Sequence, residues 1–269
     1  MCPPLSRRLH QSWGHRAIER PIAKCKFLTG RSSINLKANH PNRKLFNGVG
    51  ALAIVLAILA ACLCTEPLRS AFALDMNQIQ SSFKNLGGRP QALVDWQKLL
   101  VDARDLPNPE KLKRVNEFFN HHILYAEDIE VWGEKEHWAT PMESLAKGRG
   151  DCVAYTMAKY FVLRELNVPD SQLRLIYVKA RIGGPESAIQ QAHMVLAYYS
   201  SPTVEPLVLD NLITDIRPAS RRADLQPVFS FNSEGIYAGV AADAAAGPGG
   251  VGRLSRWADL LQRAHAEGF

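Results

Sequence analysis

The chain has 269 residues, enough for one sizeable domain with appendages, and a formal net charge of +6. The charge is unevenly spread, because residues 1–48 hold ten Lys and Arg residues against the single acid Glu19 and so carry +9. Residues 49–73 are neutral, and subtracting +9 from the total of +6 leaves −3 for the rest of the chain. Nucleic-acid-binding domains neutralise phosphates with many basic side chains, so this remainder argues against that class of function.

An apolar run near the start of the chain has the features of an export signal. Two basic residues precede the run over residues 49–63. At about fifteen residues it is shorter than the roughly 20 of a membrane span and typical of a signal-peptide core. Ala71–Ala73 follows an A-x-A cleavage pattern, which predicts a mature start at Leu74. Two alternatives stay open: Leu59–Cys62 resembles a lipid-attachment motif, or the segment stays uncleaved as an anchor. All three predict a domain outside the cytoplasm.

The next fifty or so residues have the pattern of helices. A short amphipathic helix is predicted over residues 76–85, and Pro90 opens a second one. Asn108 is the predicted N-cap of a third helix, which ends near His122. Residues 123–140 are predicted to form an aromatic and acidic loop. Its carboxylates are either a surface cluster or part of a cation site, and sequence spacing does not separate these readings.

A cysteine stands at the predicted start of the next helix. Asp151 is a good N-cap, and apolar residues at four-residue spacing begin with Val153. In the first turn of a helix, unpaired backbone N–H groups and the helix dipole favour a thiolate, so Cys152 is a candidate nucleophile. Cys152 is also the only cysteine after residue 64, which excludes a disulfide or a multi-cysteine zinc site in this region. The alternative is a small core cysteine that lies near a helix start by chance.

After Pro169 the apolar pattern changes to the period of two that is typical of strands. Strands are predicted over 173–180, 192–199 and 205–211, with a further strand or pair within 229–237. Helices followed by short-looped strands indicate an α+β domain with an antiparallel sheet. A last amphipathic helix is predicted over residues 253–266.

Two residues on the predicted strands complete a candidate catalytic set. His193 lies within the second strand among hydrophobic neighbours, and Asp210 closes the third. A cysteine nucleophile needs a base, and the base needs an acceptor that orients it. Each residue alone also has an ordinary interpretation, as a core histidine or as a strand-end aspartate. Together with Cys152, they predict a thiol, an imidazole and a carboxylate brought together by a helix that packs across the sheet.

Several motifs occur in the order of a known family: Trp138-Ala-Thr-Pro, Gly150-Asp-Cys, Leu173-Arg-Leu-Ile-Tyr-Val, Ala192-His-Met-Val-Leu and Leu207-Val-Leu-Asp-Asn. Over residues 76–239 the chain resembles the bacterial transglutaminase-like cysteine proteases, and within them the LapG-type periplasmic proteases. The resemblance implies a papain/transglutaminase-like core, in which N-terminal helices and a nucleophile helix pack on an antiparallel sheet. It also implies that Cys152 is the nucleophile, His193 the general base and acid, and Asp210 the orienting group.

The same resemblance implies a biological setting. A periplasmic endopeptidase of this type cuts a large surface adhesin near its N-terminus, at a paired-alanine site, and so controls biofilm attachment. It requires calcium, is held by an inner-membrane receptor that senses cyclic-di-GMP, and is a monomer. The family motif reads Gly-Asp-Cys-Glu-Asp-Tyr, whereas Val153 and Ala154 stand here in place of the two acids. Calcium takes six to eight oxygen ligands, so we expect weak or no calcium binding, with Asp151 as the remaining candidate ligand.

Two alternative functions remain on the same fold. One is acyl transfer to an amine, as in transglutaminases, and the other is a binding or regulatory module with weakened catalysis. The predicted organisation has five parts: a basic disordered leader (1–48), a signal peptide or membrane anchor (49–73), a transglutaminase-like cysteine protease domain (74–239), a flexible linker (240–252) and a C-terminal helix (253–269).

Overall fold

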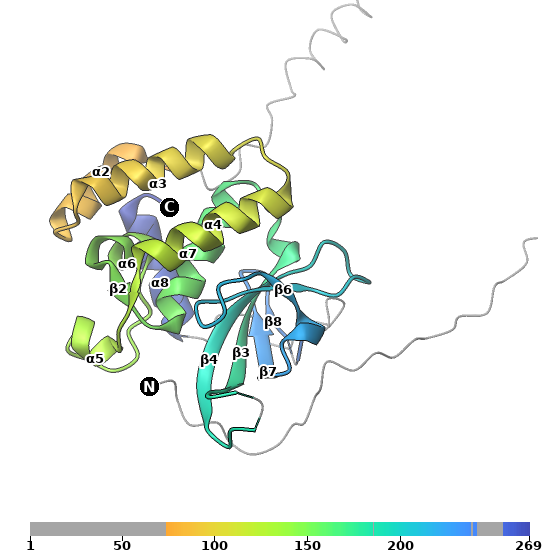
Figure 1. Cartoon of the computed structure of the whole chain (residues 1–269). Helices are drawn as coiled ribbons and strands as arrows, with labels where there is room; N and C mark the ends of the chain where they lie inside the picture. The colour runs from red at the N-terminus through yellow and green to blue at the C-terminus, as the bar shows by residue number, and fades with distance from the viewer. Residues whose placement is uncertain (1–73, 185, 238, 241–254) are drawn as a thin grey trace, which may run out of the picture. The chain divides into compact units, whose positions relative to one another are not determined.

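The computed structural model describes residues 74–184, 186–237, 239–240 and 255–269 (Figure 1). The predicted leader, the apolar run and nearly all of the predicted linker lie outside these residues, so the domain boundaries stay predictions. Among the described helices, none is long and apolar enough to cross a membrane.

Helices form one side of the domain and a twisted sheet the other (Figure 1). The helices are α2 (Met76–Asn85), α3 (Pro90–Ala103), α4 (Asn108–His122), α5 (Asp128–Val131), α6 (Pro141–Lys147), α7 (Cys152–Glu165) and α8 (Ser255–Glu267). The predicted N-cap at Asn108 is wrong by one residue, because Pro107 precedes the helix and Asn108 is its first residue. The Asn108 amide instead donates to the Tyr198 hydroxyl at 3.2 Å, which is a tertiary contact that local pattern does not reveal.

The segment predicted as a loop over residues 123–140 is partly ordered into regular structure. Strand β1 (Leu124–Tyr125) pairs in parallel with β2 (Arg149–Gly150), and α5 follows β1. Helix α6, which was not predicted, begins at a capping box in which Thr140 and Glu143 bond each other's backbone N–H groups. This helix ends at Gly148, whose φ of 61° is the left-handed conformation that glycine adopts without strain.

The main sheet has six strands in the order β6-β5-β4-β3-β7-β8, and all of its neighbours are antiparallel. The strands are β3 (Leu173–Arg181), β4 (Gln190–Tyr198), β5 (Leu207–Leu209), β6 (Arg217–Pro218), β7 (Leu225–Phe231) and β8 (Ile236–Tyr237). The predicted α+β class with an antiparallel sheet is therefore confirmed. The third predicted strand is shorter than expected, so Asp210 follows β5 directly rather than lying inside it.

Both faces of the sheet are apolar. Successive side chains of a strand point to opposite faces, and apolar residues occupy both sets of positions. On β3, Leu175 and Tyr177 belong to the large core shared with the helices, whereas Ile176 and Val178 belong to a smaller cluster. Helix α7 packs against β3 and β4, and α4 and α6 pack against α7. Twelve of its 14 residues are consequently buried, as in a helix that is apolar on all sides. The element that begins at Cys152 is thus held at the centre of the domain.

Close contact at Gly150 sets where α7 begins. A Cβ added at Gly150 would lie 2.5 Å from the Cβ of Ala154. We expect Gly150→Ala to displace the first turn of α7 and to lower the free energy of unfolding by about 1–3 kcal/mol, the usual cost of overpacking. Urea unfolding monitored by circular dichroism measures this change.

A compensating variant provides the control. In the double variant Gly150→Ala/Ala154→Gly the clash is removed, so most of the loss should be recovered, less the roughly 1 kcal/mol that glycine costs inside a helix. If Gly150→Ala unfolds with the same urea midpoint as the wild type, no such steric constraint exists.

Candidate active site

The candidate nucleophile lies at the first residue of α7. The Asp151 carboxylate accepts hydrogen bonds from the N–H groups of Val153 at 2.9 Å and Ala154 at 3.1 Å, so the predicted N-cap is confirmed. Cys152 is 6 % exposed and is the only free cysteine in the described part of the chain. Its position at the positive end of a 14-residue helix favours the thiolate.

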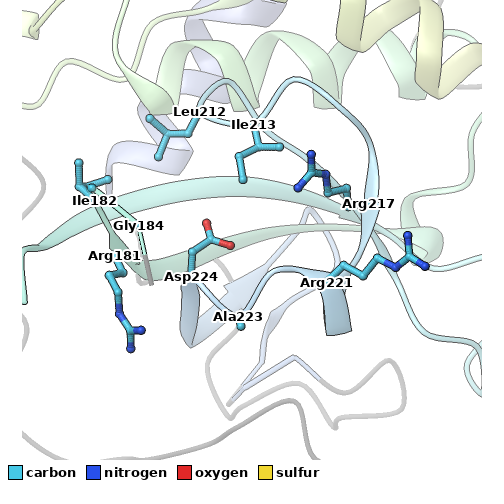
Figure 2. A pocket seen from close by; sticks show the side chains of 10 residues that line it. Arg181, Ile182, Gly184, Leu212, Ile213, Arg217, Arg221, Ala223 and Asp224 are labelled. Atoms are coloured by element: carbon cyan, nitrogen blue, oxygen red, sulfur yellow. The ribbon is translucent and has the colours of Figure 1, made fainter. Parts of the chain in front are cut away.

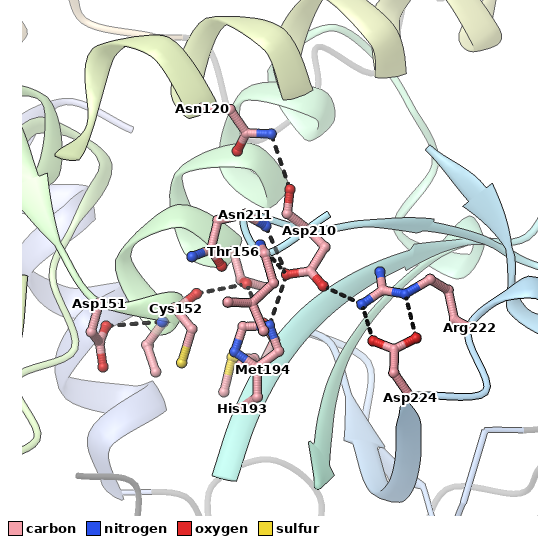
Figure 3. A network of polar contacts seen from close by, with 12 residues as sticks. Asn120, Asp151, Cys152, Thr156, His193, Met194, Asp210, Asn211, Arg222 and Asp224 are labelled. Atoms are coloured by element: carbon pink, nitrogen blue, oxygen red, sulfur yellow. Dashed lines mark hydrogen bonds and ion pairs between the residues drawn. The ribbon is translucent and has the colours of Figure 1, made fainter. Parts of the chain in front are cut away.

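His193 and Asp210 form one hydrogen-bonded pair. The Nε2 atom of His193 lies 2.7 Å from Oδ1 of Asp210, and both side chains are buried. Because Nε2 bonds the carboxylate, Nδ1 is the ring nitrogen left to face a nucleophile. Figure 3 shows Cys152 at the start of α7 and His193 on β4, two elements that pack against each other. The Thr156 hydroxyl supports this arrangement, since it lies 2.8 Å from the carbonyl oxygen of Cys152 and 3.0 Å from that of Met194, the residue after His193.

Asp210 is held as a carboxylate by several donors. Besides His193, its Oδ1 accepts the backbone N–H groups of Asn211 at 2.7 Å and Leu212 at 3.2 Å. Its Oδ2 accepts from Nη2 of Arg222 at 2.6 Å. Burial alone would raise the pKa of Asp210, but the hydrogen bond and charge of His193, together with Arg222, hold the pKa well below its usual value. The site therefore keeps a negative charge beside the imidazole.

Sequence analysis did not identify three residues that surround Asp210: Asn120, Lys159 and Arg222. Asn120 from α4 and Lys159 from α7 both donate to the Asp210 carbonyl oxygen, at 3.0 and 3.1 Å. Burial lowers the pKa of Lys159 to about 7, against the opposing effect of Asp210. Lys159 could have been predicted to lie near the site, because it is seven residues after Cys152 in an apolar helix and the two positions share a helix face. Arg222 gave no such signal, because it follows another arginine in a loop.

A cleft of about 550 Å³ opens onto the cysteine. One side comes from the segment between β1 and α6, and the other from the start of β4. Its lining residues are Tyr125, Glu127, Ile129, Lys135, Asp151, Cys152, Gln190, Gln191 and Ala192. Cys152 is thus buried by its neighbours but reachable from the cleft, as a nucleophile that attacks a bound chain must be.

A second hollow of about 540 Å³ includes no member of the candidate catalytic set in its lining (Figure 2). Arg217, Arg221 and Asp224 contribute to its walls together with Leu212 and Ile213. Asp224 also bonds the buried Arg222, so the hydrogen-bond network of Asp210 reaches the wall of this hollow.

The residues around Asp151 do not supply a full calcium site. Asp128 is buried, with one carboxylate oxygen that bonds no protein atom. Burial of Asp151, together with the charge of Asp128, raises the pKa of Asp151 to about 6. These two acids are candidate ligands, but Asp151 already uses Oδ1 as a helix cap, and Val153 and Ala154 carry no side-chain oxygen. In the described residues no group of three or more His, Cys, Asp or Glu side chains is placed to hold a metal ion. The donor set is therefore poor for a cation that prefers several charged oxygens.

A thiol at the start of a buried helix, packed on an antiparallel sheet that carries a bonded histidine and aspartate, defines a papain/transglutaminase-like cysteine peptidase. Comparison with known proteins gives the family. Residues 101–224 match the family model described as bacterial transglutaminase-like cysteine proteinase. The chain belongs to this family and is a cysteine peptidase.

Solved structures of LapG from Legionella pneumophila are similar over nearly their whole length. One is 32 % identical, with a TM-score of 0.59, and the match covers 72 % of this chain and 99 % of that one. An EGTA-treated form is 32 % identical, with a TM-score of 0.61 and coverage of 72 % and 100 %. A calcium-bound form is 34 % identical, with a TM-score of 0.58 and coverage of 70 % and 97 %. A search of curated proteins gave no match.

Proposed function

We propose that this chain is an endopeptidase in which Cys152 is the nucleophile, His193 the general base and acid, and Asp210 the group that orients the imidazole. The observation that carries the proposal is the buried 2.7 Å bond between His193 Nε2 and Asp210, beside a cysteine at a helix start. With Nε2 bonded to the carboxylate, Nδ1 is the ring nitrogen available to the thiol of a nucleophile–base pair.

The reaction follows from these positions. The Cys152 thiolate attacks the carbonyl carbon of a peptide bond, and negative charge develops on the carbonyl oxygen near the positive end of α7. His193 gives its proton to the leaving amine, and the C–N bond breaks to leave a thioester on Cys152. His193 then takes a proton from water, which attacks the thioester and restores the free enzyme. Asp210 stays ionised throughout and stabilises the imidazolium.

The substrate and setting are proposed from the family resemblance. The substrate is a large surface adhesin, cut near its N-terminus at a paired-alanine site, and its release controls biofilm attachment. Residues 49–73 have the composition of an export signal, so the proposed location is the periplasm. An inner-membrane receptor that senses cyclic-di-GMP is the proposed regulator. The family, which is described as a proteinase, and the cleft that reaches Cys152 support a protein substrate.

We also propose that catalysis here does not depend on calcium. LapG from Legionella pneumophila has a calcium-bound structure, and this chain is similar to it. However, the two positions after Cys152 lack carboxylates, and Asp128 and Asp151 alone supply too few charged oxygens.

Alkylation of Cys152 across pH tests these proposals together. The full chain is treated with iodoacetamide, with calcium or with EGTA, and the labelled peptide is quantified by mass spectrometry. We expect rapid labelling that persists below about pH 7, where a free thiol with a pKa near 8.5 is almost fully protonated. The rate should be the same with and without calcium.

Two results would contradict these expectations. Slow labelling with ordinary thiol behaviour in both conditions would favour a binding module over a peptidase. A rate that rises strongly with calcium, together with micromolar binding by isothermal titration that is lost in Asp151→Ala, would overturn calcium independence and assign Asp151 as a ligand.

A further inference from the structure

Arg222 is completely buried and joins two carboxylates. Its relative exposure is 0 %, and it follows the 3-10 helix η2 (Ala219–Arg221). Nη2 donates to Asp210 Oδ2 at 2.6 Å and to Asp224 Oδ2 at 2.8 Å, and Nε donates to Asp224 Oδ1 at 3.0 Å. Asp224 therefore binds one edge of the guanidinium with both carboxylate oxygens, and this bidentate interaction directs the shared Nη2 at Asp210 (Figure 3).

A buried arginine is costly to the fold unless all of its donors are used. Arg222 does not fully meet that condition, because its Nη1 is buried and bonds no protein atom. Apolar residues of similar volume often stabilise a core as well as a buried ion pair does. Stability alone thus explains this residue poorly, and its contact with the candidate catalytic aspartate points to a role in the site.

The two oxygens of Asp210 have separate partners. Oδ1 accepts from His193 and from two backbone N–H groups, whereas Arg222 is the donor at Oδ2. The main chain of Asp210 is held independently, since Asn120 and Lys159 both donate to its carbonyl oxygen. The remaining freedom is rotation of the carboxylate about its side-chain bond. The bond at Oδ2 opposes that rotation and keeps Oδ1 aimed at the imidazole.

We propose that Arg222, anchored by Asp224, is a positioning residue for peptide hydrolysis: it fixes the rotation of the Asp210 carboxylate and, through it, the orientation of His193. This inference rests on the proposed roles of Cys152, His193 and Asp210. The hydrogen bonds of Arg222 go to Asp210 and Asp224, so its proposed effect reaches the reaction through Asp210. A misplacement of about 1 Å in such a chain can lower a rate by about 10²-fold.

The test compares four variants of the full chain. Arg222→Lys keeps the positive charge but cannot bond Asp224 with two donors while reaching Asp210. Arg222→Met removes the charge. Asp224→Ala removes the anchor together with its negative charge, and it is expected to fold because the Asp224 side chain is 29 % exposed. Arg221→Gln is the matched control, since Arg221 is adjacent and exposed and lines the second hollow.

The main measurement is the pH profile of kcat/KM for cleavage of a peptide containing Ala-Ala, with Cys152 alkylation and thermal unfolding recorded in parallel. Its alkaline limb reports loss of the imidazolium proton, which Asp210 stabilises. The charged groups that contact Asp210 are His193 from β4, Lys159 from α7 and Arg222. Loss of the Arg222 charge alone would favour imidazolium and move the limb to higher pH. Loss of the Asp210 orientation moves it to lower pH, so the two effects have opposite signs.

We expect Arg222→Lys to move the alkaline limb to lower pH and to lower kcat/KM for a peptide containing Ala-Ala by about 10- to 10²-fold. Asp224→Ala should give a smaller shift in the same direction, and Arg221→Gln should match the wild type. Because Asp224→Ala retains Arg222, it tests the inference even where the Arg222 variants do not fold.

The outcomes separate this inference from the proposed function. An activated wild-type thiol with unchanged limbs in Arg222→Lys and Asp224→Ala would overturn the role of Arg222 and leave the triad intact. A shift of the limb to higher pH would likewise overturn positioning, because it indicates a pure charge effect. A wild-type Cys152 with ordinary thiol behaviour would overturn both proposals.

Discussion

Replacement of Cys152 by alanine is expected to abolish peptide cleavage and to leave the fold intact. The thiolate is the attacking group in the proposed reaction, and neither water nor any neighbouring side chain can form the thioester in its place. Loss of a nucleophile from a catalytic triad lowers kcat by on the order of 10⁶-fold. The side chain contributes one buried sulfur to the core, so the free energy of unfolding should change by only about 1 kcal/mol.

The measurement is cleavage of a quenched fluorescent peptide containing Ala-Ala, with circular dichroism and thermal unfolding as checks of the fold. Cys152→Ser serves as a second variant of nearly unchanged shape, and it too should be inactive because a serine hydroxyl is not ionised at neutral pH. Full activity in Cys152→Ala would rule out the assignment. An unfolded Cys152→Ala beside a folded and active Cys152→Ser would show that the residue is structural.

Replacement of Asp210 is expected to damage both catalysis and stability. Asp210→Asn keeps the shape of the side chain but removes the charge that stabilises the imidazolium, so kcat should fall by about 10²- to 10⁴-fold. Asp210→Ala leaves Arg222 buried beside an empty space, and breaking a buried ion pair in this way costs about 3–5 kcal/mol. Peptide cleavage measures the first effect, and urea unfolding the second.

The pH dependence of stability gives a signature specific to Asp210. Burial would raise its pKa, but the hydrogen bond and charge of His193 together with those of Arg222 hold the pKa in the folded protein well below the usual value. A carboxyl with a lowered folded-state pKa stabilises the fold above its unfolded-state pKa of about 3.9, and that contribution is lost as the pH falls further. Wild-type stability should therefore drop more steeply below about pH 4 than that of Asp210→Asn.

An exposed aspartate provides the control for these effects. Asp215 pairs with Arg217 at 3.0 Å, and its side chain is 74 % exposed. Exposed pairs contribute about 0–1 kcal/mol, so Asp215→Asn should unfold like the wild type and cleave at the wild-type rate. If Asp210→Asn behaves like Asp215→Asn in both assays, the proposed role of Asp210 is wrong.

The fold class could be predicted because the chain alternates clearly between helical and strand periods. The period of two over 173–180 and 192–199 corresponds to β3 and β4, where alternate side chains enter two different cores. The N-cap at Asp151 could be predicted from the sequence because capping is a local interaction. Helix α6 carries an equally local signal, the capping box of Thr140 and Glu143, but its seven residues are too few to show a helical period.

The candidate site was predicted in part. The structure joins His193 and Asp210 by a hydrogen bond and places Cys152 at the start of the helix that packs against β4, while their catalytic roles stay predictions. Arg222 was not found, because nothing in the sequence distinguishes a buried arginine from its exposed neighbour Arg221. Their difference arises from where Asp210 and Asp224 lie after folding. Such contacts depend on chain segments that only the tertiary structure brings together.

Because α7 is buried, the position of Cys152 can be lost only when the domain unfolds cooperatively. Local opening in proteins is confined to segments with few buried contacts, whereas central helices open only with the whole domain. A helix with twelve of 14 residues buried belongs to the second group, so Cys152 cannot leave its place by fraying of the chain around it. Resistance to proteolysis follows from this burial, because a folded molecule does not expose the nucleophile helix to another protease. A molecule that unfolds loses the helix, and with it the activity, in the same transition.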